Sequence, residues 1–111
     1  MRTPWGTSDY EHKYAEGVTF YGTPSHGGFH VSSDRVRKIP VCLQGLSGYP
    51  VNWYEEDCAW AVVAYVFPEV FVNPESKDPT FHEEGSVKEY AKGVLTRWYP
   101  NEIAQAIREE V

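Results

Sequence analysis

The sequence predicts an α+β fold, in which a small antiparallel sheet from the N-terminal half packs against about three helices from the C-terminal half. Two observations support this prediction. Between residues 10 and 32, aromatic and β-branched residues alternate with polar ones between turns, which is the period of strands. After residue 52, apolar residues recur at helical spacing behind capping signals. The 111 residues, 41% of them hydrophobic, are expected to form a single domain over residues 1–111.

The expected sheet comes from three short segments that share the strand pattern and are separated by turns: residues 10–14, 17–21 and 29–32. We therefore expect two or three antiparallel strands in this part of the chain. Successive side chains of a strand point to opposite faces of the sheet. If Phe29 and Val31 face the core, His30 lies on the wetter face.

The expected helices cover three segments: residues 53–66, residues 86–98 and a last segment from residue 101. Asn52 followed by Glu55 has the spacing of a capping box, in which each side chain satisfies a free backbone N–H. Ser86 and Glu89 repeat that spacing, and Asn101 is a suitable N-cap. The first helix is apolar around most of its circumference, which marks it as the central, buried one.

Charge limits the choice of partner. The formal net charge is −6, from 16 acidic and 10 basic residues, so the chain should be repelled by phosphate backbones. We expect no direct contact with nucleic acid and a preference for a basic protein surface. The acids concentrate in one predicted loop: Glu75, Asp78, Glu83 and Glu84. This loop either serves solubility or forms an acidic patch that binds a basic partner.

The cysteines and apolar runs indicate the compartment. Cys42 and Cys58 lack the spacing of a metal site, and we expect two free thiols in a reducing cytoplasm. The N-terminus has no apolar run typical of a signal peptide, and the longest apolar run, residues 59–67, is too short to cross a bilayer. The prediction is a soluble cytoplasmic protein with no cofactor, no metal and no membrane contact.

Residues 23–30 are the first candidate for chemistry, because two histidines and a hydroxyl flank a glycine pair. The simplest interpretation is a tight turn in which the glycines supply positive φ, with Ser25 and His26 capping backbone groups. The alternative makes His26 a general base or a ligand contact. His26 and His30 would lie about 13 Å apart along a strand, too far to share a metal ion.

The second candidate is the acidic cluster Glu55, Glu56 and Asp57. At a helix start these carboxylates would complement the positive end of the helix dipole, which is a sufficient structural explanation. The functional alternative has Asp57 facing inward on the predicted helix and pairing with His26, His30 or Arg35. Cys58 is expected to fill the core, because the neighbouring acids disfavour its thiolate.

A third candidate is a surface for self-association. The aromatic strand face of Tyr10, Tyr14 and Tyr21 is expected to form one surface together with Tyr49, Trp53 and Tyr54. Such a surface would support a homodimer.

Several segments together resemble a known family: Thr3–Gly6, Ser25–Gly28, Trp53–Trp60 and Phe67–Glu69. The family consists of uncharacterised small domains in proteins of phages, plasmids and other bacterial mobile elements, and the resemblance spans residues 3–72. It implies the cytoplasm of a bacterial host and carries no assigned activity. By analogy, small acidic proteins from such sources are often inhibitors of host defence systems.

The leading hypothesis is a small acidic phage-type protein that binds and inhibits a basic host protein, such as a defence component of the CRISPR type. The residues expected to bind are Ser25, His30, Tyr54, Glu55, Glu75, Asp78, Glu83 and Glu84. The alternative is a small hydrolase or transferase, in which His26 is the base and Asp57 or Glu56 orients it.

Overall fold

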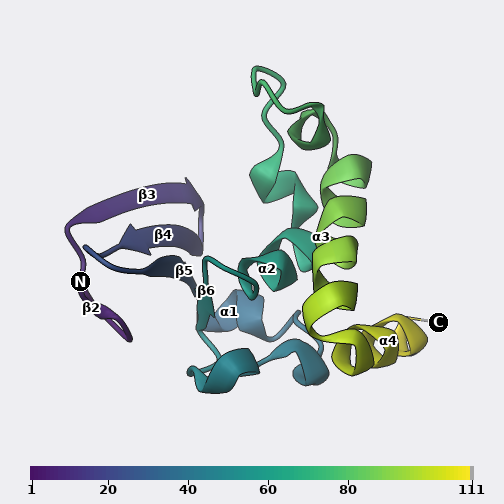
Figure 1. The fold of residues 1–111 in the computed structure, drawn as a ribbon, viewed down its shortest axis with the longest axis horizontal. Coiled ribbons are helices and arrows are strands. Elements are labelled where there is room, and N and C mark those ends of the chain that lie inside the picture. Colours follow the sequence, from purple (N-terminus) through teal and green to yellow (C-terminus); the bar gives the residue numbers. More distant parts are fainter. Residues whose placement is uncertain (111) are drawn as a thin grey trace.

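The computed structural model describes residues 1–110 and shows two antiparallel sheets followed by a group of helices (Figure 1). A small hairpin pairs the first two strands, and the main sheet has the order β3-β4-β5-β6. The strands are β1 (Arg2–Thr3), β2 (Gly6–Thr7), β3 (Tyr10–Ala15), β4 (Val18–Gly22), β5 (Gly27–Val31) and β6 (Trp53–Glu55). The predicted α+β class is confirmed.

Four α-helices complete the fold: α1 (Ser33–Val36), α2 (Trp60–Val66), α3 (Glu84–Trp98) and α4 (Pro100–Glu109). Short 3-10 helices lie between them at Val41–Leu43, Leu46–Gly48, Pro68–Phe71 and Pro79–His82. Pro68 follows the C-cap residue of α2, Phe67. Pro100 opens α4, a position that needs no backbone N–H. No helix within residues 1–110 combines the length and the apolar character needed to cross a bilayer.

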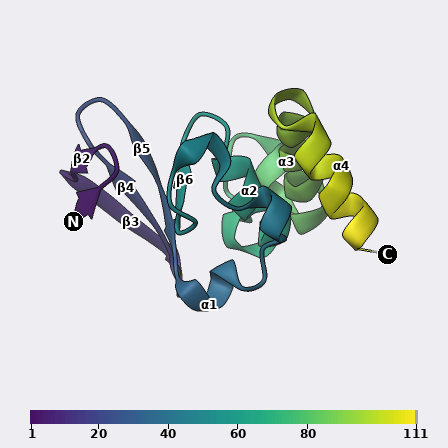
Figure 2. The ribbon, with the colours of Figure 1, turned by 90° about the horizontal axis from the view of Figure 1, so that it is seen from below.

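The sheet lies at one end of the molecule and the longer helices at the other, with α2 between them (Figure 2). Residues 61–65 of α2 are 0–3% exposed, so the prediction of a central buried helix is confirmed for this segment. α3 packs on α2, and α4 packs on α3. The core therefore runs from the inner face of the sheet through α2 to Leu95 and Ile103.

The predicted start of the first helix is wrong. Residues 53–55 form strand β6 instead, with Tyr54 paired to Phe29, and the helix begins only at Trp60. The Asn52 side chain donates to the carbonyl of Val31 rather than capping a helix. Glu55 does cap backbone N–H groups, but those of the turn that follows β6: its carboxylate accepts the N–H groups of Asp57, Cys58 and Ala59.

The two later helices begin slightly before their predicted starts. α3 starts at Glu84. The hydroxyl of Ser86 lies inside this helix and donates to the carbonyls of Thr80 and Glu83 instead of capping it. α4 starts at Pro100, with Tyr99 in the N-cap position predicted for Asn101. Ile103 and Ala106 are buried at 2% and 0%, so the predicted inner face of the last helix is confirmed.

The faces of the main sheet follow the predicted alternation. Phe29 and Val31 are buried at 6% and 0%, whereas His30 between them is half-buried on the opposite face. There its ring contacts Trp53 edge to face, with ring centroids 4.8 Å apart. The placement predicted for these three residues is confirmed.

Candidate functional site

Three sequence segments that carry the resemblance meet in one hollow, which we call the motif hollow. It has a volume of about 250 Å³. Its lining residues are Trp5, His26, Gly27, Ser47, Tyr49, Glu55, Glu56, Asp57, Cys58 and Tyr99. The β1–β2 hairpin, the start of β5 and the turn after β6 thus lie side by side, although some fifty residues separate the first from the last.

The glycine pair serves close packing rather than a turn. Neither Gly27 nor Gly28 has positive φ, so the prediction that they supply it is wrong. A Cβ on Gly28 would lie 2.3 Å from the Trp5 ring and 2.7 Å from the Tyr54 carbonyl oxygen. A Cβ on Gly27 would lie 2.7 Å from the Phe20 ring. Both positions lack a side chain because neighbouring atoms already occupy that space.

Glu55 holds the turn between β6 and α2, which we call the 55–60 turn. Its carboxylate accepts the backbone N–H of Asp57, of Cys58 at 3.0 Å and of Ala59 at 2.8 Å. Hydrogen bonds from backbone N–H groups to a carboxylate are among the stronger ones in proteins. The structural role predicted for this carboxylate is therefore present, though in a turn and not in the first turn of a helix.

The other members of the acidic cluster, Glu56 and Asp57, are exposed. The prediction that Asp57 faces inward is wrong, because it relied on a helix that does not start until Trp60. Glu56 lies beside Gly27, with its Oε2 3.2 Å from the position of a Cβ on that glycine. His26 shares the motif hollow with both carboxylates, so the structure does bring the predicted acid–base residues together.

The other two candidates of the histidine segment, Ser25 and His30, do not line the motif hollow. Ser25 and His26 are both exposed, and the His26 backbone carbonyl accepts hydrogen bonds from Thr23 N–H and Thr23 Oγ1, each at 2.7 Å. His30 belongs to the outer face of the sheet, where burial lowers the pKa of its imidazole. Within residues 1–110 no group of three His, Cys, Asp or Glu side chains has the arrangement of a metal site.

The hollow offers acid–base groups but no thiolate. Burial, together with the charges of Glu55 and Asp57, raises the pKa of Cys58 above its ordinary value. Burial also raises the pKa of Tyr99, whose hydroxyl lies 2.6 Å from that of Ser47. At neutral pH the thiol and the phenol therefore keep their protons. Chemistry in this hollow would have to use the His26 imidazole and the carboxylates.

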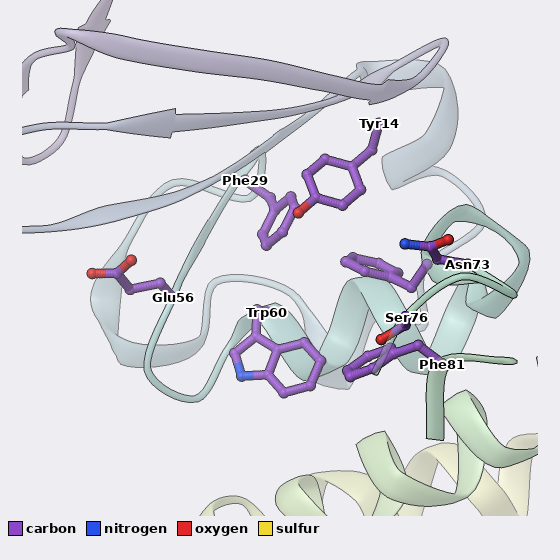
Figure 3. A pocket seen from close by; sticks show the side chains of 8 residues that line it. Tyr14, Phe29, Glu56, Trp60, Asn73, Ser76 and Phe81 are labelled. Carbon is purple, nitrogen blue, oxygen red and sulfur yellow. The ribbon is translucent and has the colours of Figure 1, made fainter. Parts of the chain in front are cut away.

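A second hollow, the aromatic cleft, lies between the sheet and the helices (Figure 3). Its volume is about 410 Å³. Its lining residues are Tyr14, Phe29, Glu56, Trp60, Phe71, Asn73, Ser76 and Phe81. The side chains of Tyr14 and Phe29 project from the sheet into the cleft, and those of Trp60 and Phe81 face them from the helical side (Figure 3). Except for Phe29, these rings are only partly buried.

A third hollow, the helix hollow, has a volume of about 540 Å³ and opens on the outer side of α3. It is lined by Asp57, Trp60, Glu89, Tyr90, Gly93, Val94, Arg97 and Trp98. Tyr90 and Trp98 are 51% and 55% exposed, which is unusual for large rings. The 55–60 turn therefore borders all three hollows: Glu56, Asp57 and Trp60 are each shared by two of them.

The surface around this turn is aromatic and acidic. Ten of the 17 aromatic residues line the three hollows: Trp5, Tyr14, Phe29, Tyr49, Trp60, Phe71, Phe81, Tyr90, Trp98 and Tyr99. The ionised groups among their lining residues are four carboxylates and the guanidinium of Arg97. Sequence reasoning missed Trp60, Phe71, Phe81 and Trp98, because they come from separate segments and form no local pattern.

The acidic loop adjoins the aromatic cleft. Glu75, Asp78, Glu83 and Glu84 are all exposed, and the same loop contributes Asn73, Ser76 and Phe81 to the cleft. The Asp78 carboxylate accepts the Thr80 N–H at 2.9 Å and so caps a 3-10 helix, which lowers the pKa of its carboxyl. Asp78 thus has a structural role in addition to its charge.

The aromatic surface predicted for self-association does not form as one patch. Tyr10 and Tyr14 lie on the face of Phe20, whereas Tyr21 lies on the opposite face against Trp53. Tyr54 is 1% exposed, so this residue, also predicted to bind a partner, lies in the core. Successive residues of one strand face opposite sides of the sheet, and the predicted surface grouped residues from both sides.

The comparisons with known proteins give one family. No match was found among curated proteins or among solved structures. A family model described as a domain of unknown function (DUF7007) matches residues 1–111. Since this match spans the whole chain, the chain belongs to the DUF7007 family.

Proposed function

We propose that this chain is a small acidic binding protein that docks on a basic protein of a bacterial host and inhibits it by occupancy. The observation that carries the proposal is the surface around the 55–60 turn. There, partly exposed aromatic rings and four carboxylates surround three adjoining hollows. Aromatic residues are enriched at protein interfaces, where large rings supply contact area and anchors.

Charge supports the same proposal. The net charge of −6 and the exposed acids of the neighbouring loop favour encounter with a positively charged surface. The proposed setting is the cytoplasm of a bacterium during phage or plasmid life, and a defence component such as a CRISPR effector is the proposed kind of target. This setting rests on the resemblance of the Thr3–Gly6, Ser25–Gly28 and Trp53–Trp60 segments.

The proposal is tested by capture from bacterial lysate on the immobilised chain at two salt concentrations. Between about 0.1 M and 1 M salt the Debye length falls from about 10 Å to about 3 Å, so an electrostatically bound partner is released. Reversal of Glu75, Asp78, Glu83 and Glu84 to Lys should weaken capture and its salt dependence. Purified partner and chain are then combined in a partner-activity assay, in which inhibition should follow occupancy.

A matched control reverses four exposed acids elsewhere: Asp9, Glu11, Glu16 and Glu109. The net charge of the two variants is then equal. They differ in the position of the reversed charges and in the cap that Asp78 provides. If both variants lose capture equally, the partner responds to the net charge of the chain and not to the acidic loop. Capture that persists unchanged in the loop variant would remove the acidic loop from the binding surface.

A second candidate function is an enzyme, because His26, Glu56 and Asp57 do line one hollow. In that case His26 is the general base and a carboxylate orients it, for a hydrolysis or group transfer. The His26→Ala variant should lose all activity and keep the melting temperature, since the His26 side chain is exposed. Mass spectrometry of a captured partner, incubated with wild type or variant, would detect a covalent change that only the wild type makes.

A further inference from the structure

We propose that the aromatic cleft holds the guanidinium of an arginine side chain presented by the basic partner. This inference rests on the proposed function and specifies which group of the partner the chain recognises. It concerns a hollow that neither His26 nor Cys58 lines; of the candidate acid–base residues, Glu56 alone borders it.

The rings of the cleft pack against one another. The Tyr14 and Phe29 ring centroids are 5.3 Å apart, and Phe29 and Phe71 are 5.4 Å apart, both edge to face. Trp60 and Phe71 continue the set at 6.3 Å. Edge-to-face packing is the preferred arrangement of aromatic pairs, so these rings support one another. The volume of about 410 Å³ that they enclose is in the range of small-ligand sites.

The electrostatics of the cleft favour a cation. The faces of aromatic rings carry partial negative charge, and Glu56 lies at the edge of the cleft (Figure 3). No Lys or Arg lines the cleft. The same chain already places its own cations on rings elsewhere: Arg35 lies 4.8 Å from the Phe67 ring and Arg97 lies 5.5 Å from the Trp98 ring. Within residues 1–110, the cleft rings hold no such cation.

Polar groups along the cleft select arginine over an apolar guest. Besides Glu56, the residues Tyr14, Ser76 and Asn73 bring oxygen atoms to a lining that is largely aromatic. Asn73 Oδ1 and Ser76 Oγ already accept the backbone N–H groups of Glu75 and Asp78. An apolar side chain would cover the Tyr14 hydroxyl without giving it a hydrogen-bond partner, at a cost in free energy. A guanidinium is planar, weakly hydrated and carries five N–H donors, so it can stack on a ring and donate at its edges. A lysine ammonium offers no flat face.

The first test uses peptides as probes and the indole N–H resonance of Trp60 as the reporter. The probe is a blocked Gly-Arg-Gly peptide, and the comparison peptides carry citrulline, lysine, trimethyl-lysine or leucine at the centre. Citrulline keeps the shape of arginine without its charge. We expect saturable shifts with the arginine peptide and affinity at least about tenfold lower with citrulline, as a desolvated cation–π contact implies. Equal or tighter binding of any comparison peptide would overturn the assignment.

The second test uses substitutions in the cleft. Trp60→Leu should weaken binding of the arginine peptide about tenfold or more, and Glu56→Gln about threefold. Trp60 is partly buried, so its replacement can also disturb the fold. The Glu56 side chain is exposed, so Glu56→Gln tests the cleft in a protein that keeps its fold. Glu11→Gln, an exposed acid of β3 outside the cleft, is the matched control. Unchanged affinity in both cleft variants would move the peptide to another site and refute the proposal.

The two proposals fail in different ways. Loss of partner capture in the loop variant but not in Trp60→Leu would leave the proposed function intact and remove the cleft from it. If the arginine peptide binds at Trp60 but no partner is captured from lysate, the cleft remains a guanidinium site and the proposed inhibitor function is refuted.

Discussion

The motif hollow and the aromatic cleft lie on either side of Glu56, and they are built differently. The motif hollow comes from dense sequence segments in which some residues hold the fold: Glu55 caps a turn, and Gly28 leaves room for the Trp5 ring. The aromatic cleft comes from scattered residues whose rings remain partly exposed. A conspicuous sequence motif can thus indicate residues that pack in the fold. A surface that is free to bind can instead consist of residues that are distant in sequence and that the fold brings together.

The largest expected effect tests the packing role of the motif glycines. Gly28→Ala places a methyl group 2.3 Å from the Trp5 ring and within 3 Å of the backbone of β6. We expect the free energy of unfolding to fall by about 3 kcal/mol, since backbone atoms cannot move aside cheaply. Chemical denaturation measures it. Gly93→Ala is the control: this exposed position of α3 has open space around it, so alanine should stabilise by about 0.5–1 kcal/mol.

A smaller effect is expected from the carboxylate that caps the 55–60 turn. Glu55→Gln keeps the shape but removes the charge from hydrogen bonds to Cys58 and Ala59 N–H. The loss should be about 1–2 kcal/mol in the free energy of unfolding. Glu56→Gln, one residue along and exposed, should leave stability within about 0.5 kcal/mol. If both variants unfold alike, the distinction between fold-holding and free carboxylates is wrong.

Two buried tyrosines give the next comparison. The Tyr54 hydroxyl has no hydrogen-bond partner within residues 1–110, whereas the Tyr65 hydroxyl donates to Glu110 Oε1 at 2.8 Å. Tyr54→Phe should therefore leave the free energy of unfolding unchanged or raise it slightly, by up to about 1 kcal/mol. Tyr65→Phe should lower it by about 1 kcal/mol. A marked loss in Tyr54→Phe would mean that the hydroxyl has a partner, such as an ordered water.

The smallest effect is a pH dependence from the outer face of the sheet. Burial lowers the pKa of His30 below its reference value of 6.5, so the unfolded chain binds the proton more readily than the folded one. Its contribution to stability is present above pH 6.5 and is lost as the pH falls toward the lowered pKa. Thermal unfolding at several pH values should show a shallower acid loss for His30→Gln than for the wild type. The exposed His12→Gln variant should follow the wild type.

The sequence was sufficient for those features that depend on local period. The strands at residues 10–31, the buried segment of α2 and the inner face of α4 all follow from alternation or helical spacing. The start of α2 was mispredicted because Trp53, Tyr54 and Glu55 are consistent with either a helix turn or a short strand. Pairing with β5 decides in favour of the strand, and that partner is distant in sequence.

The candidate site was predictable only in part. The proximity of His26 to Glu56 and Asp57 was expected from residue types, but the geometry behind that expectation was wrong. The aromatic cleft left no signal, since Tyr14, Trp60 and Phe81 lie in three separate segments. The high aromatic content alone indicated that some large rings would remain at the surface.

The strand order also has a consequence for the sequence of folding events. β3, β4 and β5 form a meander joined by short turns, so their pairing closes only small loops. β6 joins this meander only after residues 32–52 have been closed into a loop. We therefore expect the three-stranded meander to form early in folding and β6 to dock late. The motif hollow, which needs β6, the β1–β2 hairpin and Tyr99 together, would be among the last features of the molecule to appear.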